Sequence, residues 1–184
     1  MPLYDPYKRL PPVQKFTLRS ADIADGETLN VAQCSGLFGG PGQDRSPHLA
    51  WTGYPARTLS FAVTCYDPDA LTVSGFWHWA VYDIPASVDE LPTGTGDASG
   101  ENLPAGAKML VNDAGRRGFL GAAPPPGDPP HRYMFVVHAL DAATLDVTTE
   151  ATPAWLGFRL VEHAVARAGL TPVFGIPGGS DAIR

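Results

Sequence analysis

The chain has 184 residues, of which 44% are hydrophobic and 17% are charged. This length suits one ordinary domain and this composition suits a folded globular protein, which excludes intrinsic disorder. Nineteen acidic against thirteen basic residues give a formal net charge of -6, and no segment gathers lysine and arginine. We therefore expect no nucleic-acid partner and no attraction to an anionic membrane surface.

The N-terminal residues carry prolines, tyrosines and two basic side chains but not the apolar run of a secretory signal. They predict an extended arm over residues 1–14, at the start of a single domain that spans residues 1–184. No apolar run approaches the ~18 residues of a membrane-spanning helix. Cys34 and Cys65 lack metal-ligand spacing and predict reduced, buried thiols. The sequence thus predicts a soluble cytoplasmic protein without a transmembrane segment.

Strand patterns dominate the chain. A weak strand signal covers residues 15–19, and the first strong one covers residues 59–66, where side chains alternate with the period of two typical of a strand. Residues 77–84 are aromatic and β-branched, and a second weak signal follows at residues 107–111. Residues 132–140 are almost continuously apolar. We expect the three strong segments to form the centre of a sheet, buried on both faces.

One helix is predicted near the C-terminus. Thr152 is a suitable N-cap and Pro153 suits the first helical position. Apolar residues then recur at spacings of three and four, and Gly169 is a suitable C-terminal stop. The residues expected to face inward are Trp155, Phe158, Val161 and Val165, with Leu156, Leu160 and Ala164 widening the stripe.

The motifs of the common enzyme classes are missing from the sequence. There is no GxSxG nucleophile elbow and no GxxxxGK phosphate loop. The glycines between Pro92 and Pro104 neither follow a strong strand nor open a helix, so they do not form a dinucleotide site. We therefore predict a protein that is not an enzyme and that uses no cofactor.

Chemically versatile residues gather instead at loop and strand junctions. Asp67 and Asp69 flank a proline after the strand at 59–66, and His78 lies among aromatic residues at the start of the next strand. A proline-rich loop at 124–127 then leads to His131 at the start of the strand at 132–140. Each feature taken alone is explained as a polar turn, a packed histidine or a strand entry.

The order and spacing of five segments change this interpretation. The segments are SPHLAW at 46–51, DPDA at 67–70, WHWAVYDIP at 77–85, PPPG at 124–127 and HRYMF at 131–135. In the order and spacing of these segments the chain resembles the phosphatidylethanolamine-binding proteins, in particular their bacterial Raf-kinase-inhibitor-like branch, and the resemblance covers about residues 15–175. The resemblance implies a mainly β fold, with two antiparallel sheets packed as a sandwich and a helix near the C-terminus.

The resemblance also implies a pocket for anions and phospholipid headgroups at one end of the sandwich. Its residues would be Asp67, Asp69, His78, Pro124, Pro125, His131 and Tyr133, with Trp79 as a supporting aromatic residue. A zwitterionic headgroup suits these side chains, since its ammonium can lie by an aspartate while its phosphate lies by the histidines. We predict no metal, although two histidines and one carboxylate are also a metal-binding set.

The predicted function is therefore the binding of a phosphatidylethanolamine-like or phosphorylated ligand. One alternative is a regulatory protein that inhibits a kinase or a protease. Another is a hydrolase in which His131 and Asp67 act as acid and base, although no expected nucleophile accompanies them. The bacterial relatives favour a homodimer. The chain departs from many relatives at Leu71, in place of a proline, and at Ala122 and Ala123, where a glycine is common.

Overall fold

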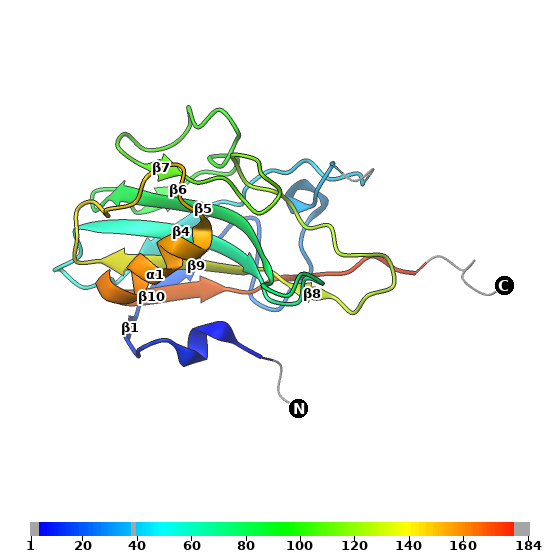
Figure 1. The fold of residues 1–184 in the computed structure, drawn as a ribbon, viewed down its shortest axis with the longest axis horizontal. Helices are drawn as coiled ribbons and strands as arrows, with labels where there is room; N and C mark the ends of the chain where they lie inside the picture. Colours follow the sequence, from blue (N-terminus) through cyan, green and yellow to red (C-terminus); the bar gives the residue numbers. More distant parts are fainter. Residues whose placement is uncertain (1–3, 38–39, 179–184) are drawn as a thin grey trace.

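The computed structural model describes residues 4–37 and 40–178, and Figure 1 shows that most of them belong to strands or to the long loops between them. The strands are β1 (Gln14–Lys15), β2 (Thr17–Arg19), β3 (Leu49–Thr52), β4 (Ser60–Asp67), β5 (Phe76–Pro85), β6 (Glu90–Leu91), β7 (Lys108–Met109), β8 (His131–Arg132), β9 (Met134–Leu140), β10 (Ala164–Leu170) and β11 (Val173–Phe174). The helices are the 3-10 turns η1 (Pro6–Arg9) and η2 (Val31–Gln33) and the α-helix α1 (Pro153–His163). No helix within the described ranges has the length and apolar character needed to cross a bilayer.

The strands form one large sheet and two small ones. The large sheet has the order β1-β10-β9-β4-β5-β7, the second has the order β2-β3-β6, and β11 pairs with β8. The paired strands are antiparallel except β1 and β10, which run parallel. The three strongest strand predictions, now β4, β5 and β9, lie side by side within the large sheet. The mainly β fold with a helix near the C-terminus is confirmed.

The core lies between the large sheet and the β2-β3-β6 sheet. Phe61, Val63 and Cys65 alternate along β4 and pack in this core with Leu49 and Trp51 of β3. The intervening residues of β4 face the other side of the sheet, and they are also almost all buried. Burial on both faces explains why β4 tolerates apolar residues at successive positions.

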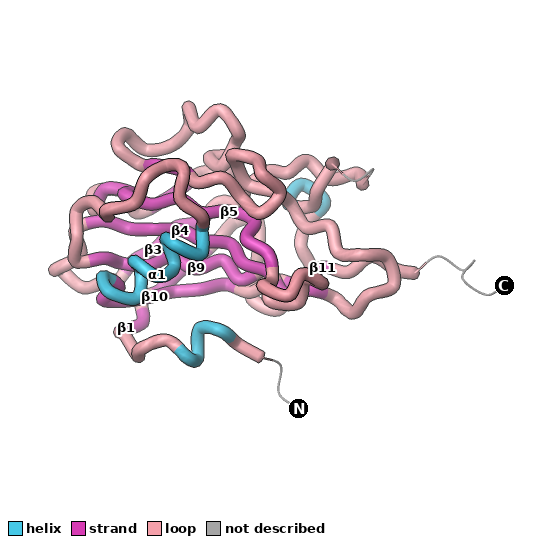
Figure 2. Tube along the Cα trace, in the orientation of Figure 1, coloured by secondary structure: helices cyan, strands magenta, loops and turns pink. Residues whose placement is uncertain are grey.

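Helix α1 covers the outer face of the large sheet, as Figure 2 shows in cyan over magenta strands. Leu156 and Leu160 of α1 pack there with Ala80 and Tyr82 of β5 and Leu140 of β9. The predicted N-cap is confirmed, because Thr152 Oγ1 accepts a hydrogen bond of 3.2 Å from the backbone N–H of Trp155.

The predicted inward face of this helix was right for Leu156 and Leu160, which were expected to widen it, and wrong for its main stripe. Trp155, Phe158 and Val161 are 49%, 55% and 39% exposed, whereas Leu156 and Leu160 are buried. Both sets recur with helical spacing, so periodicity alone did not decide which set faces the sheet.

The helix is also shorter than predicted. It ends at His163, and the following residues, Val165 and Gly169 among them, form β10 instead of a further turn. The registered pairing of β10 with β9 outweighs the helical pattern of the local sequence.

The predicted N-terminal arm crosses the outer face of the large sheet on its way to β1. Its first three residues lie outside the described ranges. The arm contains the short turn η1, capped by Asp5, whose Oδ1 accepts a hydrogen bond of 3.0 Å from the N–H of Tyr7. The Tyr7 hydroxyl lies 3.3 Å from Thr64 Oγ1 on β4, which ties the arm to the sheet. Both predicted free cysteines are confirmed as free and buried.

Candidate functional site

The ends of β4, β5 and β8 surround a cavity of about 200 Å³. Asp67 is the last residue of β4 and pairs with Phe76, the first residue of β5, so both strands open toward the same end of the sheet. The lining side chains and backbone come from Asp67, Ala70, Leu71, Phe76, His78, Leu120, Gly121, Ala123, Pro124, Pro125, His131 and Tyr133. Segments far apart in the sequence thus converge on one concave site.

Asp67 is the residue that organises this site. Its side chain is almost fully buried, and its Oδ1 accepts hydrogen bonds from the backbone N–H groups of Asp69 at 2.7 Å and Ala70 at 3.0 Å. Its Oδ2 lies 2.8 Å from Nδ1 of His131, which donates to it. The Asp-Pro-Asp turn therefore fixes the carboxylate, and the carboxylate fixes the imidazole ring.

His131 presents its other nitrogen toward a second carboxylate. The Nε2 atom lies 3.7 Å from Oδ2 of Asp128, beyond ordinary hydrogen-bond distance. The backbone of His131 pairs with Phe174 of β11, so the C-terminal segment helps to place the ring.

His78 owes its direction to a β-bulge. Cys65 pairs with Trp79 and Tyr66 pairs with Trp77, which leaves His78 as an extra residue of β5. A bulge of this kind re-aims a side chain. The Nδ1–H of His78 donates to the backbone carbonyl of Leu120 at 2.8 Å. Burial lowers the pKa of His78, which keeps the ring neutral at pH 7.

Tyr133 adds a hydroxyl group to the same cavity. Its ring meets that of His78 edge-on, with 5.2 Å between the ring centroids. Its hydroxyl is buried and has no hydrogen-bond partner within the described ranges. Burial, and then the charge of Asp67, raise the pKa of Tyr133, so this hydroxyl stays protonated and available as a donor.

Two predicted site residues do not line the cavity. The carboxylate of Asp69 accepts from Nε and Nη2 of Arg132, both at 2.7 Å, and from the Arg132 backbone N–H at 3.0 Å. Burial opposes ionisation of Asp69, but these hydrogen bonds outweigh it and lower its pKa. Trp79 is buried in the core, where its indole N–H points to Sδ of Met109 at 3.2 Å. The structure thus brings together Asp67, His78, Pro124, Pro125, His131 and Tyr133.

The sequence analysis did not identify three residues that lie at or beside the cavity. Leu120 acts through its backbone carbonyl, for which no side-chain pattern exists. Phe76 lines the wall beside His78, with 4.8 Å between the ring centroids. Asp128 lies three positions before His131, a spacing that could have identified it. Among the departures from the resemblance, Leu71 and Ala123 both line the cavity.

The alternative to a headgroup site is a metal site formed by two histidines and a carboxylate. In the described part of the chain, no three side chains of His, Cys, Asp or Glu are grouped closely enough to hold an ion. Within residues 4–37 and 40–178, Nε2 of each pocket histidine has no partner at hydrogen-bond distance. This geometry suits the recognition of a ligand by hydrogen bonds.

Comparisons with known proteins agree with this fold. A family model described as "PBP: Phosphatidylethanolamine-binding protein" matches residues 19–175. The UPF0098 protein YbcL of Escherichia coli K12 is 45% identical over 161 residues, which cover 88% of each chain. The UPF0098 protein YbhB of the same organism is 45% identical over 157 residues, which cover 85% of this chain and 98% of YbhB.

The crystal structure of E. coli YbcL, described as a new member of the mammalian PEBP family, matches the fold with a TM-score of 0.86. The match covers 88% of this chain and 99% of the crystallised chain. Sequence and structure thus agree over nearly the whole domain. The chain therefore belongs to the phosphatidylethanolamine-binding protein family.

Proposed function

We propose that this protein binds a small phosphate-containing or zwitterionic molecule, such as a phosphatidylethanolamine-like headgroup, in the cavity beside Asp67. One observation carries the proposal. His78 and His131 are each anchored through Nδ1, which leaves both Nε2 atoms for a ligand, and the unpaired hydroxyl of Tyr133 lines the same space. The Tyr133 hydroxyl can donate to a phosphate oxygen, and each Nε2 can accept from a phosphate O–H or, once its ring is protonated, donate to a phosphate oxygen.

The size of the cavity limits the ligand. A volume of about 200 Å³ lies below the roughly 300–1,000 Å³ common for drug-sized ligands. A phosphate or a headgroup is therefore the part of the ligand that enters, and any acyl chain would remain outside.

The carboxylates decide where an ammonium group would lie. Asp67 already accepts three hydrogen bonds, and Asp69 is paired with Arg132. Asp128 is half-buried near His131 and has no closer partner within the described ranges. The ammonium of a zwitterion is thus best placed beside Asp128, with the phosphate toward the histidines.

Binding of sulfate should strengthen as the pH falls below about 7, because a neutral ring that donates through Nδ1 offers sulfate no donor at Nε2 until the ring gains a proton. The contribution of His78 should come at the acid end, since burial lowers its pKa. Sulfate is the probe because it does not itself titrate in this range. His131→Ala should weaken binding about tenfold or more, because one donor to a charged oxygen is lost. Isothermal titration at several pH values measures both effects.

The matched control for His131→Ala is His163→Ala, on α1 outside the cavity. It should leave sulfate affinity unchanged. Asp128→Asn should weaken O-phosphoethanolamine more than sulfate, since only the former carries an ammonium group. Equal affinities of wild type and His131→Ala, or binding that strengthens as the pH rises, would contradict the proposal.

The homodimer, the cytoplasmic location and an inhibited kinase or protease remain predictions from the sequence. Sedimentation equilibrium at micromolar concentration checks the first, and a monomer there would contradict it. Cell fractionation checks the location. Assays of a kinase or a protease with the purified protein distinguish a regulatory role from simple ligand binding.

A further inference from the structure

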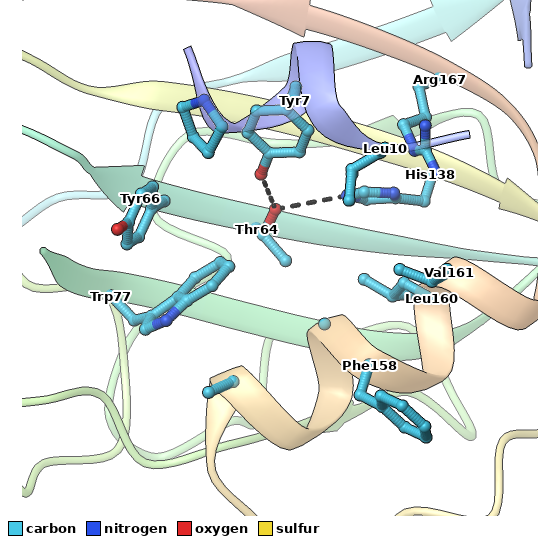
Figure 3. A pocket seen from close by; sticks show the side chains of 13 residues that line it. Tyr7, Leu10, Thr64, Tyr66, Trp77, His138, Phe158, Leu160, Val161 and Arg167 are labelled. Carbon is cyan, nitrogen blue, oxygen red and sulfur yellow. Dashed lines mark hydrogen bonds between the residues drawn. The ribbon is translucent and has the colours of Figure 1, made fainter. Parts of the chain in front are cut away.

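A second cavity, of about 390 Å³, lies on the outer face of the large sheet between η1 and α1 (Figure 3). It shares no lining residue with the cavity beside Asp67. Its volume falls within the range of about 300–1,000 Å³ typical of small-molecule sites. It is therefore a candidate binding site in its own right.

The walls of this groove are mainly apolar. Tyr66 of β4 and Trp77 of β5 lie at one end, with 4.5 Å between their ring centroids. Leu160 and Val161 of α1 form the opposite side. Phe158 also lines the groove, although it is 55% exposed. Apolar side chains exposed in this way gain free energy when an apolar ligand covers them.

The floor carries polar groups in a row across three strands. Thr64, His138 and Arg167 come from β4, β9 and β10, and they lie on the same outer face. Thr64 Oγ1 lies 3.5 Å from Nε2 of His138. His138 is only 3% exposed, and its Nδ1 has no partner within the described ranges.

Arg167 is the one formally charged residue that lines the groove. Burial, and then the nearby Arg167 charge, lower the pKa of His138 to about 3, so His138 stays neutral. The guanidinium of Arg167 donates from Nη1 to the backbone carbonyl of Pro11 at 3.1 Å, while its buried Nε has no partner. Among the described residues, no carboxylate forms an ion pair with Arg167. A half-buried cation without a counterion is unfavourable.

We propose that this groove binds an amphipathic organic anion, namely a medium-length carboxylic acid with an alkyl or aromatic body. The apolar body lies between Trp77 and α1, and the carboxylate lies toward Arg167. The ligand then covers the exposed apolar walls and supplies the missing counterion at once. A neutral apolar molecule would leave Arg167 unpaired, and a small inorganic anion would leave the walls uncovered.

Octanoate and 1-octanol are the probes, since they share most of the apolar chain and differ in the charged head. Wild-type protein should bind octanoate saturably in isothermal titration at pH 7 and should bind 1-octanol more weakly. Arg167→Met, which keeps an apolar stem, should weaken octanoate at least tenfold and change 1-octanol less than twofold. Arg167→Lys should retain most of the affinity for octanoate. Sulfate binding at the other cavity should be unchanged in Arg167→Met.

A second variant tests the cavity itself without weakening the helix. Gly157 lies on α1 at the groove, and a Cβ there would meet Trp77 at the ordinary contact distance of 4.0 Å. Gly157→Leu should favour the helix and should fill the groove, so that octanoate and 1-octanol both lose at least tenfold in affinity.

Several outcomes would overturn the proposal. Failure of octanoate to bind wild type saturably is one such outcome, and equal affinity of octanoate for wild type and Gly157→Leu is another. Equal losses of octanoate and 1-octanol in Arg167→Met would show an unspecific apolar surface. A further contrary outcome is that wild type does not bind octanoate and forms a dimer that Gly157→Leu dissociates. A second copy of the chain would then occupy the groove.

Discussion

Asp67→Ala is expected to lower the free energy of unfolding by about 3–5 kcal/mol, because each buried donor left without a partner costs about 1–3 kcal/mol. The change removes the acceptor of three hydrogen bonds and leaves His131 and two backbone N–H groups without their partner. Sulfate binding should also be lost, because the imidazole ring is no longer held toward the cavity. Urea unfolding and isothermal titration measure the two effects.

Asp69→Ala is the matched control, two positions along the same turn. The Asp69 carboxylate is more exposed, at 23% of its side-chain surface, and pairs with Arg132. Its removal should cost up to about 1 kcal/mol, as for a partly exposed ion pair, and should weaken sulfate less than Asp67→Ala does. If the two variants lost equal stability, the buried Asp67 network would not have the role assigned to it.

The stability of the protein should fall steeply in acid, and His138 should account for much of the slope. Its folded-state pKa is about 3 because of burial and the nearby Arg167, whereas an unfolded histidine titrates near 6.5. Between these values the unfolded chain binds one more proton, so stability present above pH 6.5 is lost as the pH falls toward 3. The His138 contribution approaches about 1.4 kcal/mol per pH unit.

His138→Gln should therefore flatten the plot of unfolding free energy against pH between about 6 and 4. Val137→Ala, at the next position of β9, is the control, because it removes buried methyl groups without changing a titrating group. It should lower stability by a similar amount at every pH. Parallel curves for wild type and His138→Gln would contradict the neutral, buried state of His138.

The sequence predicted the parts of the fold that depend on strong local patterns. These parts are the three buried strands β4, β5 and β9 and the capped start of α1. It did not predict which part of the broad apolar stripe α1 buries, since Leu156 and Trp155 both recur with helical spacing in it. It did not predict that β10 replaces the last helical turns, because only pairing with β9 makes that segment a strand.

The sequence predicted which residues form the candidate site, but it did not predict which groups these residues contact. The resemblance pointed to Asp67, His78 and His131, which the structure brings to one cavity. That Asp69 would turn to Arg132 depends on where β8 lies, which the sequence does not reveal. The direction of His78 depends on a bulge in β5, and local sequence carries no signal for the extra residue.

The pairing of β1 with β10 links Gln14 to Ala166, near opposite ends of the described chain. During synthesis the early segment leaves the ribosome long before its partner exists, so the large sheet cannot be completed until β10 has been made. Contacts so distant in sequence also slow folding, because the intervening chain must be ordered first. Nascent chains that stop short of β10 should therefore leave the edge of the apolar strand β9 unpaired, which makes them substrates for chaperones that bind exposed apolar surface.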